Sequence, residues 1–203
     1  MATTDLEQRG EFVRRAFRLE WLTAAWMMLE AVIAIGSGIA AHSLSLLAFG
    51  ADSLIELASA GVLLWRLDVE VRRGEDFPEA IEHGASRIAG GLLFALAAYV
   101  LASAGYGLSQ HEGQQFSTPG LILSALAIPT MYVLAKAKIR VAAQIGSRAL
   151  RADAIESMTC AYLSGTVVLG LLAQLVIGAW WLDTITALAI VALLVSEGFE
   201  AWQ

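Results

Sequence analysis

Hydrophobic residues occur in six long blocks that short polar stretches separate. The blocks cover residues 19–40, 44–65, 85–108, 119–138, 149–177 and 179–199. Each has about the 20 residues that a helix needs to cross a hydrocarbon core roughly 30 Å thick. Only helices and closed barrels satisfy their own backbone polar groups in lipid, and blocks of this length are typical of helices. The pattern therefore predicts an all-α membrane protein, a bundle of six transmembrane helices.

The fifth block is the least regular, because its first half contains three charged residues. We expect one long helix here, beginning near Ser147. The first 18 residues are polar and charged, so we expect a cytoplasmic N-terminal segment (1–18) followed by one transmembrane domain (19–203). No separate cytoplasmic C-terminal domain is expected. The first apolar block is too long for the core of a cleavable signal peptide.

Basic residues lie on only one side of the predicted spans. Four precede the first span, four lie between the second and third, and five, including Lys138, lie between the fourth and fifth. The other three connections have none. Because Lys and Arg accumulate in cytoplasmic loops, both termini are predicted to be cytoplasmic. We expect no Lys or Arg deep inside a span.

Composition supports this class and excludes others. Hydrophobic residues make up 58% of the chain and charged residues 16%, against about 25% charged in soluble domains. No clustered basic face indicates nucleic-acid binding, and the single Cys160 excludes an intramolecular disulfide. No nucleophile–base pair or cofactor motif indicates an enzyme. We expect a multi-pass protein of a bacterial cytoplasmic membrane, with no prosthetic group.

Ionisable residues inside the spans mark the candidate site, since each costs about 2.5–3.5 kcal/mol to insert and normally faces a cavity or a partner. Asp52 and Glu56 lie four residues apart in the second span. Asp153, Glu156 and Cys160 follow a spacing of three and then four residues in the fifth. At about 100° per residue, each set projects from one face of its helix. Two oxygens from one helix, with an oxygen and a sulfur from the other, form a plausible four-ligand metal site.

Other roles remain open for several of these residues. Asp153 either attracts the ion at the cytoplasmic mouth or acts as a helix cap or salt-bridge partner. Cys160 is alternatively a small buried hydrophobe. Glu30, near the middle of the first span, is a candidate proton carrier, extra ligand or structural acid. Three acids near span ends are expected to be interfacial or packing residues: Glu20, Asp183 and Glu197.

Carboxylate and thiolate donors suit zinc and its divalent neighbours better than magnesium or calcium, which prefer oxygen alone. Both donor types also bind protons. Loading of the metal would therefore release protons, which provides a physical route to metal/proton exchange.

Three segments resemble the cation diffusion facilitator superfamily. SLSLLAFGADSLIE (43–56) is similar to the family's SLLADSLxD, whose two acidic ligands fall on Asp52 and Glu56. ADAIESMTC is similar to ADxxHxxxD, so the family's histidine falls on Glu156 and its last aspartate on Cys160. GAWWLDTITALAI resembles the family's sixth span. The chain resembles a short branch of the superfamily, related to transmembrane protein 163, in which the cytoplasmic metal-sensing domain is absent.

This resemblance implies proton-coupled export of a divalent metal by alternating access, with zinc as the first expectation, and a homodimer. Two alternatives remain at this point. One is a membrane protein that binds metal as a buffer, sensor or modulator without moving it. The other is a proton-coupled exporter of organic cations that uses the same acids.

Overall fold

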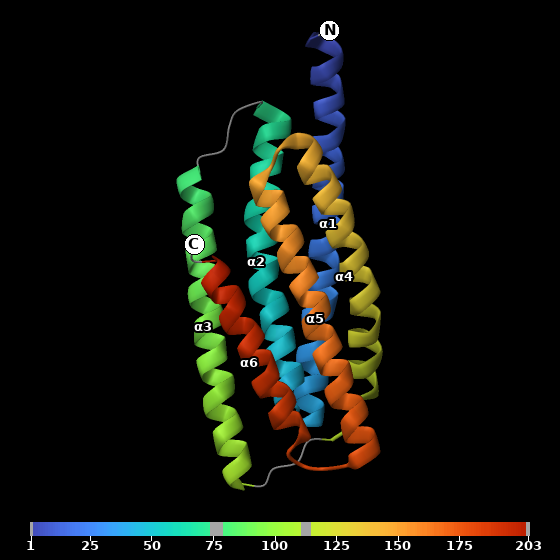
Figure 1. The fold of residues 1–203 in the computed structure, drawn as a ribbon, viewed down its shortest axis with the longest axis vertical. Helices are drawn as coiled ribbons and strands as arrows, with labels where there is room; N and C mark the ends of the chain where they lie inside the picture. Colours follow the sequence, from blue (N-terminus) through green and yellow to red (C-terminus); the bar gives the residue numbers. More distant parts are fainter. Residues whose placement is uncertain (1, 74–78, 111–114, 202–203) are drawn as a thin grey trace.

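Six long helices make up the protein. The computed structural model describes residues 2–73, 79–110 and 115–201 (Figure 1). The helices are α1 (Ala2–Ala41), α2 (Leu44–Arg73), α3 (Glu79–Gln110), α4 (Thr118–Ile145), α5 (Arg148–Ile177) and α6 (Leu182–Ala201). All six are long and apolar enough to cross a membrane, and the described residues contain no strand. The predicted all-α bundle of six spans is confirmed.

Successive helices run in opposite directions along the bundle. The starts of α1, α3 and α5 and the ends of α2, α4 and α6 lie toward one end, here called the N-terminal end (Figure 1). The other ends of the six helices lie toward the opposite end. The segments that contain the basic residues therefore share one end, as the loop pattern requires. That this end faces the cytoplasm stays a prediction.

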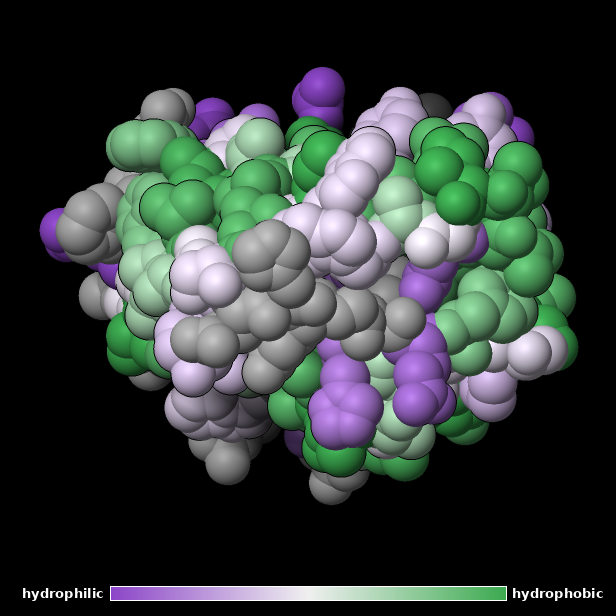
Figure 2. Space-filling view, turned by 90° about the horizontal axis from the view of Figure 1, so that it is seen from below, coloured by the Kyte–Doolittle hydropathy of each residue, from purple (hydrophilic) through white to green (hydrophobic). Residues whose placement is uncertain are grey.

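Polar and apolar residues are distributed as in a membrane protein. Large apolar side chains cover the outer surface of the helices, and Val176 is 84% exposed. Several acids lie inside, among them Glu20, Glu30 and Asp52, which are fully buried. Figure 2 views the opposite end and shows hydrophobic side chains on its left, upper and right sides and hydrophilic side chains in its lower middle. Lipid favours such an outer surface, whereas buried charge needs partners inside the bundle.

Local caps determine where α5 begins. Ser147 precedes the helix, and its hydroxyl accepts a hydrogen bond from the Leu150 amide at 3.2 Å. Serine is a preferred N-cap residue because it satisfies one of the free N–H groups of the first turn. Gly146, in the left-handed conformation with φ 70°, ends α4. The predicted single long fifth helix is confirmed.

Helices α1 and α2 approach each other closely at two glycines. A Cβ atom on Gly38 would lie 2.9 Å from the backbone nitrogen of Leu47, and one on Gly50 would lie 2.9 Å from that of Ile35. Both distances are shorter than van der Waals contact. The absence of a side chain therefore allows the two backbones to pack together and places the acid of α1, Glu30, against α2.

Asp183 joins α6 to the start of α2 at the opposite end. Its carboxylate accepts hydrogen bonds from the hydroxyls of Ser43 and Ser45, at 2.8 and 2.5 Å. It also accepts bonds from the amides of Leu44 and Ser45, at 2.6 and 3.3 Å. Asp183 is thus a buried link between two helices, and its four donors offset the cost of its burial.

Replacement of Asp183 by alanine should destabilise the bundle by about 2 kcal/mol, because it removes the shared acceptor of two buried hydroxyls and the first amides of α2. Thermal unfolding of the purified protein in detergent would measure this as a lower Tm. Glu200→Ala removes an exposed acid from the same helix and is the matched control. Equal melting of the two variants would contradict the structural role of Asp183.

Candidate ion site

Three buried acids from two helices meet inside the bundle. Asp52 and Glu56 come from α2 and Glu197 comes from α6, and one carboxylate oxygen of each lies within 4.8 Å of the others. Helical periodicity explains the first two, since residues four apart share a face. The crossing of α6 against α2 supplies the third. The predicted pairing of Asp52 with Glu56 on one face is therefore present in the structure.

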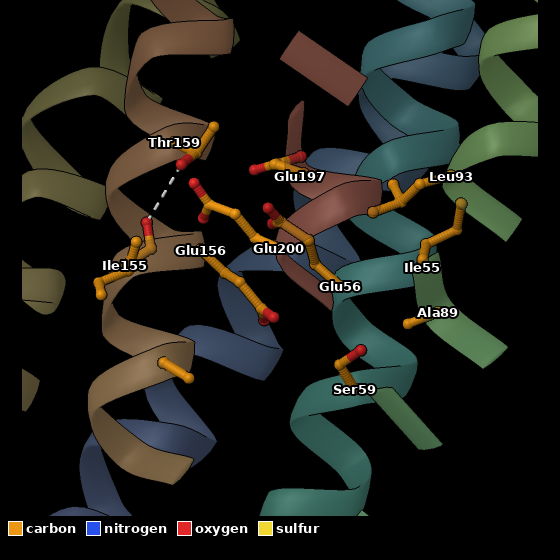
Figure 3. Close-up of a pocket in the computed structure, with 11 residues that line it drawn as sticks. Ile55, Glu56, Ser59, Ala89, Leu93, Ile155, Glu156, Thr159, Glu197 and Glu200 are labelled. Atoms are coloured by element: carbon orange, nitrogen blue, oxygen red, sulfur yellow. Dashed lines mark hydrogen bonds between the residues drawn. The ribbon is translucent and has the colours of Figure 1, made fainter. Parts of the chain in front are cut away.

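The two carboxylates that α2 contributes to this cluster lack hydrogen-bond donors in the described part of the chain. No described residue donates a hydrogen bond to either oxygen of Asp52 or Glu56. The nearby Thr159 hydroxyl donates to the Ile155 carbonyl, at 3.3 Å (Figure 3). When ionised, Asp52, Glu56 and Glu197 repel one another, because their oxygens lie within 4.8 Å of one another. Buried acids in this arrangement are stable only when protons or a cation compensate their charge.

A cavity of about 230 Å³ leads to the cluster. Glu56, Glu156, Glu197 and Glu200 line it, from α2, α5 and α6 (Figure 3). Glu200 is exposed, Glu156 is half-buried and the other two are buried. The acids therefore form a graded path from the surface to the interior. The helix directions place this cavity toward the N-terminal end, because Glu200 lies near the end of α6 and Glu156 near the start of α5.

Cys160 and Glu30 form a second polar group beside the cluster. The Cys160 thiol donates to a Glu30 carboxylate oxygen at 3.3 Å, and the Ser53 hydroxyl donates to the same oxygen at 2.8 Å. The Trp26 indole donates to the other oxygen, also at 2.8 Å. Glu30 thus has three donors from three helices, and these contacts bring α1, α2 and α5 together next to Asp52.

The expectation that no basic residue lies deep in a span is wrong. Lys138, predicted from the sequence to lie between the fourth and fifth spans, lies within α4, which continues to Ile145, and is fully buried. Its ammonium lies 2.9 Å from a Glu20 oxygen of α1 and 2.5 Å from an Asp153 oxygen of α5. A buried charge requires such partners. Glu20 is therefore part of an ion triad inside the bundle, and Asp153 is a salt-bridge partner of Lys138.

The structure divides the predicted site residues into four groups. Asp52 and Glu56 lie in the cluster, Glu156 lines the cavity, and Cys160 with Glu30 lies beside the cluster, whereas Asp153 is held by lysine. Sequence reasoning missed Glu197 as a member of the cluster. The signal was available, since Glu197 is an acid inside the sixth apolar block and the cost of buried charge applies there equally.

These features define a class: a helical membrane protein with an acidic site inside the bundle and a path from that site to one end. The family model described as the cation efflux transmembrane domain matches residues 21–202, nearly the whole chain. The chain belongs to this family, whose members are cation transporters rather than enzymes. It is a multi-pass integral membrane protein. No curated protein matches the chain.

Replacement of Lys138 by methionine should lower the free energy of unfolding by about 3–5 kcal/mol, because Glu20 and Asp153 would remain buried without their cation. Lys136→Met removes the same charge from an exposed position of the same helix and should change Tm little. Differential scanning fluorimetry of both variants measures the difference. Similar Tm values for the two variants would show that the triad does not stabilise the fold.

Proposed function

We propose that the protein transports a divalent metal ion across the membrane in exchange for protons. The observation that supports this most directly is the pair of buried carboxylates, Asp52 and Glu56, at the inner end of an acidic cavity. Neither receives a hydrogen bond from any residue that the structure describes. Carboxylates bind divalent cations, and they must lose protons to do so. Metal and protons therefore compete for one set of oxygens, which is the physical requirement for exchange at a single site.

The residues have different roles in this proposal. Asp52 and Glu56 hold the ion, and Glu156 guides it from the mouth of the cavity. That Cys160 is a ligand stays a prediction, as does a proton-carrying or ligating role for Glu30, because the hydrogen bond between these two must break before either coordinates metal. Asp153 acts through its salt bridge rather than as a ligand.

The direction of transport and the oligomeric state are further parts of this proposal. If the N-terminal end is cytoplasmic, as the basic residues indicate, the cavity loads from the cytoplasm and the protein is an exporter. Rocking of the helices would then expose the site to the other side, where protons replace the metal. Zinc is the first ion to test, and the family resemblance favours a homodimer.

The double substitution of Asp52→Asn with Glu56→Gln should reduce metal flux at least about tenfold, since loss of even indirect ligand support costs about that much in affinity. Purified protein in sealed liposomes, with a pH dye inside, measures uptake of zinc, manganese, cobalt and cadmium together with proton movement. Glu11→Gln, a neutralised acid on the exposed surface of α1, is the control.

The expected result is metal flux in one direction coupled to proton flux in the other. Both fluxes should be lost in the double variant. Metal binding without flux would contradict transport and favour a buffer or modulator. The absence of both would leave the organic-cation exporter, which predicts proton-coupled movement of organic cations that zinc does not inhibit.

Cys160→Ser tests whether the thiol is a ligand. Thiolate prefers soft ions, so a ligating Cys160 predicts a larger loss of affinity for cadmium than for manganese, by about tenfold or more. Competition between the two metals for the purified protein measures this ratio. An unchanged ratio would show that the thiol serves only as a hydrogen-bond donor to Glu30.

A further inference from the structure

The buried face of α6 carries an acid at each end. Asp183 and Glu197 flank an apolar stripe made by Ala187, Ile190 and Leu194, with a spacing of three or four residues throughout. This spacing places all five residues on one face of the helix. Glu197 therefore continues the face that packs into the bundle, and an apolar residue would be the ordinary choice at its position.

The two acids face different groups on α2: hydrogen-bond donors at one end and acidic side chains at the other. Asp183 faces the start of α2, where two hydroxyls and two amides donate to it. Glu197 faces Asp52 and Glu56. Ionised carboxylates accept hydrogen bonds but cannot donate them. At the Asp183 end of the α2–α6 contact, the protein itself supplies the hydrogen-bond donors that the carboxylate needs. At the Glu197 end, the facing carboxylates need a cation or protons between the two helices.

The spacing of the oxygens suits a single ion. In a tetrahedral shell with metal–oxygen bonds of about 2.1 Å, two ligand oxygens lie about 3.4 Å apart. The three oxygens lie within 4.8 Å of one another, so small side-chain movements would bring all of them into coordination range. Asp52 is 0% exposed and receives no hydrogen bond from a described residue, which is independent support for a cation at this place.

We infer that Glu197 is a third ligand to the transported ion and that the ion bridges α2 and α6. This inference rests on the proposed function and extends it to a helix outside the two that carry the predicted ligands. A core of three carboxylates selects divalent cations that accept oxygen ligands. Because α6 carries one ligand and is tied to α2 by Asp183 at its far end, the affinity for the ion depends on how closely α6 approaches α2.

Calorimetric titration of the purified protein with zinc and with manganese tests the ligand role. Glu197→Gln keeps the size of the side chain but removes its charge, and it should weaken binding at least about tenfold. Glu197→Asp keeps the carboxylate and should weaken binding less. Glu200→Gln removes a charge at the exposed mouth of the same cavity and should have a much smaller effect, since solvent screens that group.

Thermal unfolding separates ligation from a structural role. Without metal, Glu197→Gln should melt no lower than the unmodified protein, because it relieves repulsion with Asp52 and Glu56. Added metal should raise the Tm of the unmodified protein through binding to the folded state. This rise should be much smaller in Glu197→Gln. A lower Tm without metal, together with an intact metal-induced rise, would assign Glu197 to packing and overturn the inference.

The outcomes distinguish this inference from the proposed function. Equal binding by Glu197→Gln and Glu200→Gln, with binding lost in the Asp52→Asn, Glu56→Gln double variant, would retain the ion site on α2 and exclude Glu197 from it. Undiminished binding and flux in the double variant would instead overturn the proposed site itself, whatever the result for Glu197.

Discussion

Compensation of charge inside an apolar bundle is the constraint on which the rest of this structure depends. A buried carboxylate without a partner is costly in lipid or protein. The protein meets this cost in different ways. Asp183 receives four hydrogen bonds from the start of α2, while Glu20 and Asp153 share the ammonium of Lys138. Asp52 and Glu56 have neither donors nor a basic partner among the described residues. The proposed ion site has to bind and release a cation, so a permanently charged lysine or arginine there would compete with the ion.

Helix α2 organises this arrangement, because it contacts α1, α3, α5 and α6. Its close packing with α1 places Glu30 against Ser53, and its crossing with α6 places Glu197 near Asp52 and Glu56. Donors and acceptors thus alternate along one helix: serines at its start, two acids near its middle and a serine between those acids. The same helix provides a stable attachment for α6 and the two acids of the proposed ion site.

Helical periodicity explains which part of the site could be predicted from the chain. Asp52 and Glu56 share a face because they are four residues apart, whatever surrounds them. The position of Lys138 could not be predicted in this way. Its neighbours Lys136 and Arg140 are exposed, and only the packing of α4 against α1 and α5 turns Lys138 inward. Glu197 lies close to the end of its apolar block, so its membership depends on the crossing of α6 with α2.

The sequence by itself determined six spans, their alternating directions, the start of α5 and the helix faces that carry acids, because hydrophobic length, capping and periodicity are local properties. Only the tertiary structure decided which acids meet one another and which meet a cation or a donor. Those pairings join residues as far apart as Cys160 and Glu30, or Asp183 and Ser43. Such contacts arise from the crossing of packed helices, and no spacing along the chain encodes that geometry.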